Sequence, residues 1–163
     1  MDSIFPKSRK VVDFRAVFWA GIVSGLVFLV VNMLLSLIIL GTPWIFIRMV
    51  AALLLGQDVL PPPASFDPGV FIVAVLIHLL LSLLFTTILA MIIHKWGLAV
   101  GIIGGAIFGL ALYAINFYTF SFFFPWFFPL RSWILLVSHI FYGATAGGLY
   151  EALEVERFER LDT

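Results

Sequence analysis

The chain has 163 residues, of which 63% are hydrophobic and only 11% are charged. Soluble domains are typically about 45–50% apolar and about 25% charged, so this composition excludes an ordinary water-soluble domain and predicts that most of the chain lies in lipid. Nine basic and nine acidic residues cancel, which gives no indication of nucleic acid as a partner. The absence of cysteine excludes disulfides and thiol chemistry.

In chain order, the hydropathy pattern predicts four membrane-spanning helices in one domain. Each is an apolar run of about 20 residues or more, which is the length that an α-helix needs to cross a bilayer. A charged cytoplasmic tail at residues 151–163 follows the last run, and we expect it to form a short helical extension in which Glu156 and Arg160 can pair. The expected fold is an all-α integral membrane protein, a four-transmembrane-helix bundle with spans at residues 16–40, 70–93, 97–120 and 131–150.

Two connections between the spans are unusually apolar. Residues 43–56 form an apolar run that Arg48 interrupts, and its 12 core residues would extend only about 18 Å as a helix. A helix of this length is too short to cross the bilayer, whose hydrocarbon core is about 30 Å thick. The run therefore predicts a short interfacial or re-entrant helix between the first and second spans, with Trp44 and Arg48 at the headgroup level. The connection at 122–131 is rich in phenylalanine and tryptophan, which is typical of an aromatic belt at a membrane interface.

The distribution of lysine and arginine predicts the orientation of the bundle. With four spans, both termini lie on the same side, and this side also holds the connection between the second and third spans. Only Arg48 and Arg131 fall on the opposite side. The positive-inside rule then places both termini in the cytoplasm, and we expect the chain to reside in a bacterial inner membrane. The basic residues on the cytoplasmic side are Lys7, Arg9, Lys10, Arg15, Lys95, Arg157 and Arg160.

Glycines recur at four-residue spacing within the spans. Because lipid supplies little hydrophobic force between helices, small residues in such rows allow close backbone packing. A second interpretation is that the glycines act as hinges of a moving gate, and plain packing is favoured over it. The glycines concerned are Gly21 and Gly25 in the first span, Gly97, Gly101, Gly105 and Gly109 in the third, and Gly143 and Gly147 in the fourth.

The few polar residues inside the spans fall at similar depths. His78 and His139 each lie eight residues after the expected outer start of a span, and Asn32 lies eight residues before the outer end of the first. At 1.5 Å per residue, each side chain is about 12 Å below the outer boundary. Such side chains should face the bundle interior, because lipid offers them no partner. The predicted layer comprises Asn32, His78, Ser82, Tyr113, Asn116 and His139.

Three interpretations of this layer remain open. The favoured one is a hydrogen-bond network that fixes the register of the helices. A second is a proton or small-ligand site that opens to the outer side, with His78 and His139 as titrating groups. A third is a bis-histidine haem site with the same two residues as axial ligands. No other cofactor is expected, and the lack of cysteine and of intramembrane carboxylates argues against a metal site.

A family resemblance rests on the order of motifs between residues 70 and 150. His78-Leu-Leu-Leu-Ser82 begins the pattern, Trp96-Gly97 follows as a turn, and a glycine-rich span and Pro125-Trp126 come next. His139-Ile-Phe-Tyr-Gly143 then closes it. This arrangement resembles the small four-helix bacterial inner-membrane proteins similar to YagU. The resemblance implies four spans and an inner-membrane location, and it implies that His78 and His139 occupy matching family positions; it implies no activity.

No motif indicates an enzyme, because the spans hold no carboxylate pair, no Ser-His-Asp set and no phosphate-binding loop. The favoured function is a structural or accessory subunit that packs, through glycine and aromatic faces, against other membrane subunits or in a homo-oligomer. The alternative is an oligomeric transporter or channel for protons or small solutes that uses the outer polar layer. Four uninterrupted spans without an internal repeat make the monomer a poor transporter. The lipid bilayer is the one partner common to all these functions.

Overall fold

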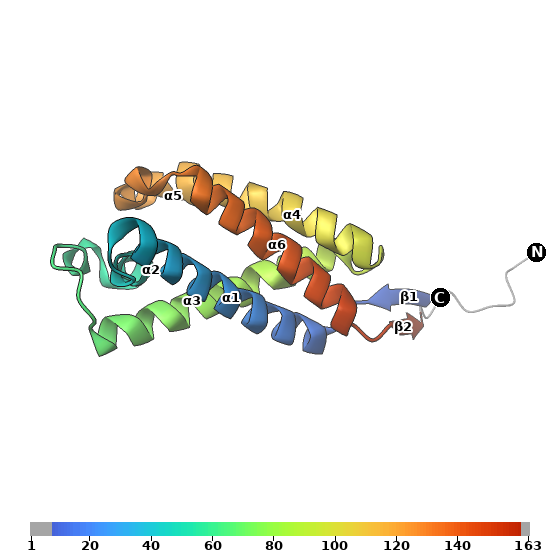
Figure 1. Ribbon diagram of the computed structural model, residues 1–163. Coiled ribbons are helices and arrows are strands. Elements are labelled where there is room, and N and C mark those ends of the chain that lie inside the picture. Colours follow the sequence, from blue (N-terminus) through green and yellow to red (C-terminus); the bar gives the residue numbers. More distant parts are fainter. Residues whose placement is uncertain (1–7, 161–163) are drawn as a thin grey trace, which may run out of the picture.

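The computed structural model describes residues 8–160 of the chain. Four helices are long and apolar enough to cross a membrane, which confirms the predicted multi-pass membrane architecture. They run side by side along one axis (Figure 1), and large apolar side chains such as Ile38 and Ile107 are exposed along their outer faces. The long helices are α1 (Phe14–Leu40), α3 (Pro68–Ile93), α4 (Leu98–Ala114) with its continuation to Phe123, and α6 (Trp133–Leu153).

Polar residues at the ends of the apolar runs set where the long helices begin. The Asp67 carboxylate caps α3 by accepting a hydrogen bond from the backbone N–H of Val70 at 2.9 Å, and Asp13 caps α1 in the same way. Ser132 caps α6. These side chains satisfy backbone donors that the first turn of a helix leaves without partners. Gly41 ends α1 with a positive φ of 76°, a conformation that glycine adopts without strain.

A short helix, α2 (Trp44–Leu55), lies between the first two long helices, and a single turn, η1 (Gln57–Val59), follows it. Ile47 and Ala51 of α2 are buried in an apolar cluster that includes Leu29 of α1 and Ala74 of α3. Arg48 holds the following loop in place: its Nη1 donates to the carbonyl oxygen of Val59 at 2.7 Å, and its Nε and Nη2 donate to that of Ser65. The helix and its loop therefore cover one end of the bundle.

The helices do not pack equally. The closest pair is α4 and α6, while α1 packs on α3 and α6, and α3 makes few contacts with α4. The reason for the close pair is the backbone itself: a Cβ at Gly105 would overlap the carbonyl oxygen of Gly143, and a Cβ at Gly147 would overlap that of Gly101.

The predicted helical continuation of the tail is wrong. α6 ends at Leu153, Glu154 is extended, and β2 (Arg157–Arg160) pairs in antiparallel register with β1 (Ser8–Val11). The last turn of α6 lies beside the start of α1, so the two strands meet and satisfy each other's backbone groups. Periodicity cannot reveal this pairing, because its two strands are separated by almost the whole chain.

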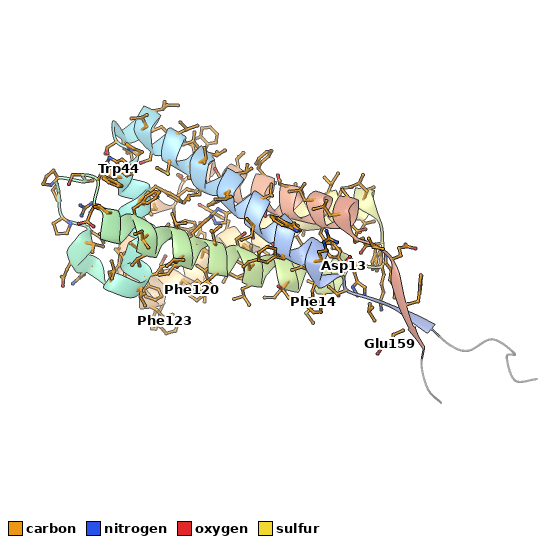
Figure 2. All side chains as sticks on the ribbon, turned by 90° about the horizontal axis from the view of Figure 1, so that it is seen from below. Asp13, Phe14, Trp44, Phe120, Phe123 and Glu159 are labelled. Atoms are coloured by element: carbon orange, nitrogen blue, oxygen red, sulfur yellow. The ribbon has the colours of Figure 1, made fainter. Side chains whose placement is uncertain are left out.

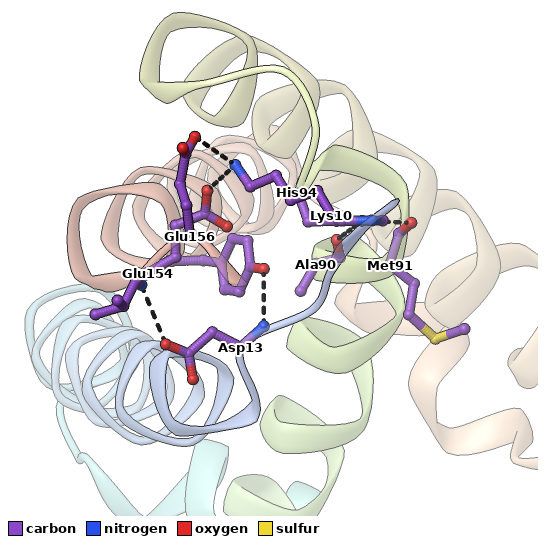
Figure 3. A network of polar contacts seen from close by, with 9 residues as sticks. Lys10, Asp13, Ala90, Met91, His94, Glu154 and Glu156 are labelled. Carbon is purple, nitrogen blue, oxygen red and sulfur yellow. Dashed lines mark hydrogen bonds and ion pairs between the residues drawn. The ribbon is translucent and has the colours of Figure 1, made fainter. Parts of the chain in front are cut away.

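Polar contacts fasten this end of the molecule (Figure 3). The Asp13 carboxylate accepts from the backbone N–H of Val155 at 3.1 Å, and the Lys10 ammonium group pairs with Glu154 and, at 3.2 Å, with Glu156. Partial burial acts to lower the pKa of Lys10, but the two carboxylates outweigh it and raise that pKa above its ordinary value of 10.5. The two ends of the chain are thus joined as a small ribbon, hereafter the terminal clasp (residues 8–13 with 154–160).

The third span is not the uninterrupted α-helix that we expected. After α4, the chain forms a π-helical segment, η2 (Ile115–Thr119), and then a short α5 (Phe120–Phe123). The aromatic connection is helical as well, with a 3₁₀ segment, η3 (Pro125–Leu130). In Figure 2, Phe120 and Phe123 lie at the same end of the bundle as Trp44, opposite the terminal clasp. We refer to this end as the aromatic end.

Candidate ligand cavity

A cavity of about 360 Å³ lies in the half of the bundle nearer the aromatic end, where α3 faces the η2 and α5 segments of the third span. A smaller cavity of about 80 Å³ shares several of its wall residues and extends toward Ser82 and Tyr142. The walls are overwhelmingly apolar and come from α1, α2, α3, η2, α5 and α6. The polar side chains common to both cavities are those of His78, Asn116 and His139.

His139 enters the cavity from α6 with only 7% of its surface exposed. Its Nδ1–H donates to the carbonyl oxygen of Leu135 one turn earlier at 2.7 Å. On the other side of the ring, Asn116 Nδ2 lies 3.3 Å from His139 Nε2. Aromatic rings surround the imidazole, with the ring centroid of Phe28 at 4.9 Å and that of Phe117 at 5.6 Å. The imidazole is therefore held in one orientation by hydrogen bonds and edge contacts.

His78 enters from α3 and contacts α1. Its Nε2–H donates to the carbonyl oxygen of Gly25 at 2.9 Å, and its ring stacks on Phe28 with 5.6 Å between centroids. This hydrogen bond requires α3 to approach the α1 backbone closely, which the missing Cβ at Gly25 allows. A Cβ there would lie 2.7 Å from Ser82 Oγ.

A second set of hydrogen bonds closes the inner end of the cavity. Ser82 Oγ donates to the carbonyl oxygen of Gly21 at 2.7 Å, and the Tyr142 hydroxyl donates to the carbonyl oxygen of Ser82 at 3.0 Å. The hydroxyl of Thr86 lies 3.2 Å from that of Tyr142. All three side chains are buried. Through this cluster, α3 is joined to α1 and to α6 at one depth.

The predicted polar layer is only partly assembled around the cavity. His78, His139, Asn116 and Ser82 line it. The Tyr113 ring packs against His139, with 5.7 Å between ring centroids, and does not line either cavity.

Asn32 lies elsewhere. Its Nδ2 donates to the carbonyl oxygen of Phe28 at 2.8 Å, and the residue lines a separate cavity of about 220 Å³ among α1, α2 and α6. Asn32 therefore does not join the histidines as the counting of residues predicted, because it faces another gap between helices.

The predicted glycine positions all lie against neighbours within the chain except one. Gly21 and Gly25 face α3, and the glycines of α4 and α6 face each other, including Gly109, whose Cβ would overlap the carbonyl oxygen of His139. Gly97 has open space around it and a φ of 83°, and it forms the turn before α4. The helix faces that carry these glycines are thus already packed against other helices of the same chain.

Sequence reasoning missed two residues of the site, Phe28 and Tyr142. Phe28 touches both histidine rings, and Tyr142 links α6 to α3. The spacing along the helix could have indicated both residues: Phe28 lies three residues after Gly25, and Tyr142 lies three residues after His139. Residues three apart share a helix face. Both are aromatic in a chain with many aromatic residues, so composition gave no reason to select them.

The geometry does not suit haem held by the two histidines. Bis-histidine ligation requires a nitrogen of each imidazole to face one iron from opposite sides. Here the Phe28 ring contacts both imidazoles, and His78 Nε2 is bonded to a backbone carbonyl oxygen. Among residues 8–160, no cluster of three or more histidine, aspartate or glutamate side chains has the arrangement of a metal site.

No family model matches the chain, and neither a curated protein nor a solved structure is significantly similar to it. The resemblance to the proteins similar to YagU therefore stays a prediction from the motifs.

Proposed function

We infer that this chain is a multi-pass membrane protein that binds a small, mainly apolar molecule in the cavity that α3 and η2 line together with α1, α2 and α6. The observation that carries this proposal is a cavity of about 360 Å³ whose walls are apolar except for His78, Asn116 and His139. Ligand sites in proteins have volumes of about 300–1,000 Å³, apolar walls and a few placed polar groups.

The surroundings of the cavity support a ligand that arrives through the membrane. Beside the cavity, Leu80 and Leu84 of α3 and Phe120 of α5 are exposed apolar residues. A molecule already dissolved in the bilayer could enter without crossing a polar surface.

For orientation, we keep the proposal that the terminal clasp is cytoplasmic and that the aromatic end faces outward, in a bacterial inner membrane. The charge distribution supports it: Lys10, Arg15 and Lys95 belong to the clasp end, whereas Arg48 and Arg131 belong to the aromatic end. Under this orientation, the cavity lies in the outer half of the bilayer.

The accessory-subunit function also stays a prediction, but its motivation is weaker. The glycine rows that suggested packing against a partner are filled by helices of the same chain. Transport remains a possible consequence of binding, since a molecule released on the other side would be carried across. We give ligand binding precedence because it requires only the cavity itself.

Filling the cavity tests the proposal. Leu81 lines both cavities, whereas Leu80, its neighbour on α3, is 65% exposed. We expect Leu81→Trp to remove the bound molecule, because the indole occupies its volume, and Leu80→Trp to leave it in place. The measurement is mass spectrometry of small molecules extracted from each purified protein, relative to protein and to bulk lipid.

The control is the folded state of both variants, checked by circular dichroism and gel filtration. A wild-type protein that carries no molecule enriched over bulk lipid would contradict the binding function. Equal enrichment in a folded Leu81→Trp variant would show that any bound molecule lies outside this cavity.

A further inference from the structure

We propose that the molecule bound in this cavity carries a neutral hydroxyl group, as an alcohol or a phenol attached to an apolar chain or ring. This inference rests on the proposed binding function and names the chemical class of the ligand. Some nitrogen and oxygen atoms of the residues around the cavity already make hydrogen bonds within the protein. The atoms that do not make such bonds determine which chemical group a ligand needs.

The tautomer of His139 is set by the backbone. A carbonyl oxygen can only accept a hydrogen bond, so His139 Nδ1, at 2.7 Å from the carbonyl oxygen of Leu135, carries the proton. In the neutral imidazole, Nε2 is then an acceptor, and the Asn116 amide nitrogen, 3.3 Å away, donates to it. The amide of Asn116 is thereby oriented, and it retains one N–H and its Oδ1 for a ligand.

The same reasoning applies to His78. Its Nε2 lies 2.9 Å from the carbonyl oxygen of Gly25 and therefore carries the proton. In the neutral ring, Nδ1 becomes an acceptor, and the residues that the structure describes supply no hydrogen bond to it. The polar residues that line the cavity consequently retain two acceptors, His78 Nδ1 and Asn116 Oδ1, and a single donor, the remaining amide N–H of Asn116.

Neutrality of both rings agrees with their surroundings. The described residues that line the two cavities include no carboxylate to pair with an imidazolium and no lysine or arginine to pair with an anion. An unpaired charge at this depth is costly. A carboxylate, phosphate or sulfonate headgroup is therefore disfavoured in the cavity.

A hydroxyl group matches this set of atoms best. It can donate to one of the acceptors and accept from the amide N–H of Asn116 at the same time. A ketone, ester or ether could use only the amide N–H and would leave the acceptors without partners, which is unfavourable in an apolar site. The apolar walls, which include Leu81, Phe85 and Phe117, then hold the rest of the molecule.

The test compares three photoreactive probes with the same alkyl chain, which carries a diazirine. One ends in a primary alcohol, one in its methyl ether and one in a sulfonate. Each is added to the full-length protein in phosphatidylcholine vesicles, and labelled peptides are quantified by mass spectrometry. We expect the alcohol to label α3 and η2 peptides at the cavity about fivefold more than the ether, the effect of about one hydrogen bond. The sulfonate should label them least.

Two variants examine the acceptors directly. In Asn116→Leu and His78→Phe, the preference for the alcohol over the ether should fall toward one, while labelling by the ether persists and shows that the cavity is intact. His78→Gln retains an amide that can donate to Gly25 and accept from a ligand, so it should restore part of the preference. This rescue distinguishes hydrogen bonding from a general loss of folding.

The outcomes separate the two proposals. If no probe labels the cavity peptides above lipid-facing peptides such as those around Ile107, the binding function itself fails. If the alcohol and the ether label the cavity equally, binding stands and the hydroxyl assignment is overturned. Preferential labelling by the sulfonate would also overturn it and would indicate a cationic site.

Discussion

At the residue scale, glycine and polar side chains act together in this protein. The carbonyl oxygens of Gly21 and Gly25 accept hydrogen bonds from Ser82 and His78 of the neighbouring helix. In lipid, a polar side chain without a partner is costly, and a missing Cβ lets it reach the second lone pair of a helical carbonyl. Glycine on α1 therefore allows the polar side chains of α3 to come close enough to form these hydrogen bonds.

The contact between α4 and α6 gives a sharp prediction at this scale. Gly105→Ala should lower the free energy of unfolding by about 1–3 kcal/mol, the usual cost of overpacking, because the new methyl group overlaps the carbonyl oxygen of Gly143. Gly104→Ala is the matched control, since a Cβ there meets Ile93 only at 3.5 Å, an ordinary contact. Reversible unfolding in mixed micelles measures both. Equal stability of the two variants would contradict backbone contact at Gly105.

At the scale of elements, α3 is the least embedded of the long helices. It contacts α4 little, and the polar cluster of Ser82, Thr86 and Tyr142 joins it to α6. This cluster, together with the packing of α3 on α1 and α2, holds α3 in place beside the cavity. The aromatic rings of α5 and α2 then cover the outer part of that space.

A double-mutant cycle tests whether the cluster couples the two helices. The Thr86 hydroxyl donates to that of Tyr142 at 3.2 Å. Tyr142→Phe and Thr86→Val should therefore each destabilise the protein, with a coupling energy of about 0.6 kcal/mol and at most about 1.7 kcal/mol, the range for hydrogen bonds between membrane helices. Tyr118→Phe is the control for loss of a tyrosine hydroxyl, because Tyr118 is 62% exposed. Unfolding free energies in the same micelles provide the values. Strict additivity of the two changes would argue against a direct link.

At the scale of the whole molecule, the two ends differ in kind. One end joins the first and last described segments in the terminal clasp, with its ion pairs and β-ribbon. The other end is covered by α2, its loop and the aromatic segments, and the cavity lies on this side. One end of the protein therefore carries the polar contacts of the terminal clasp, and the half nearer the other end is apolar and contains the cavity.

The orientation of these ends can be measured directly because the chain has no cysteine. Single cysteines at Gln57 and Trp96, both exposed and at opposite ends, should react differently with a membrane-impermeant maleimide. We expect Gln57→Cys to react in intact cells and Trp96→Cys only after permeabilisation, as the positive-inside rule requires. The reverse pattern would place the terminal clasp outside the cell. The cavity, which is nearer the opposite end, would then lie in the inner half of the bilayer.

The sequence by itself determined the properties that depend on local pattern. The four long helices are confirmed, since an apolar run of this length has no other stable form in lipid. The capping residues Asp13, Asp67 and Ser132 stand where helices start. The depths of His78 and His139 also follow from counting residues along each span. None of these properties requires knowledge of how the helices cross.

The tertiary structure alone decided which of these groups meet. The sequence predicts similar depths for Asn32 and His139, yet they line different cavities, because the gap that each side chain enters depends on how the helices cross. The pairing of β1 with β2 likewise arises from contacts between residues distant in the chain. Hydrophobic periodicity encodes one helix at a time, whereas a cavity is the space that several helices leave between them, and only their packing defines it.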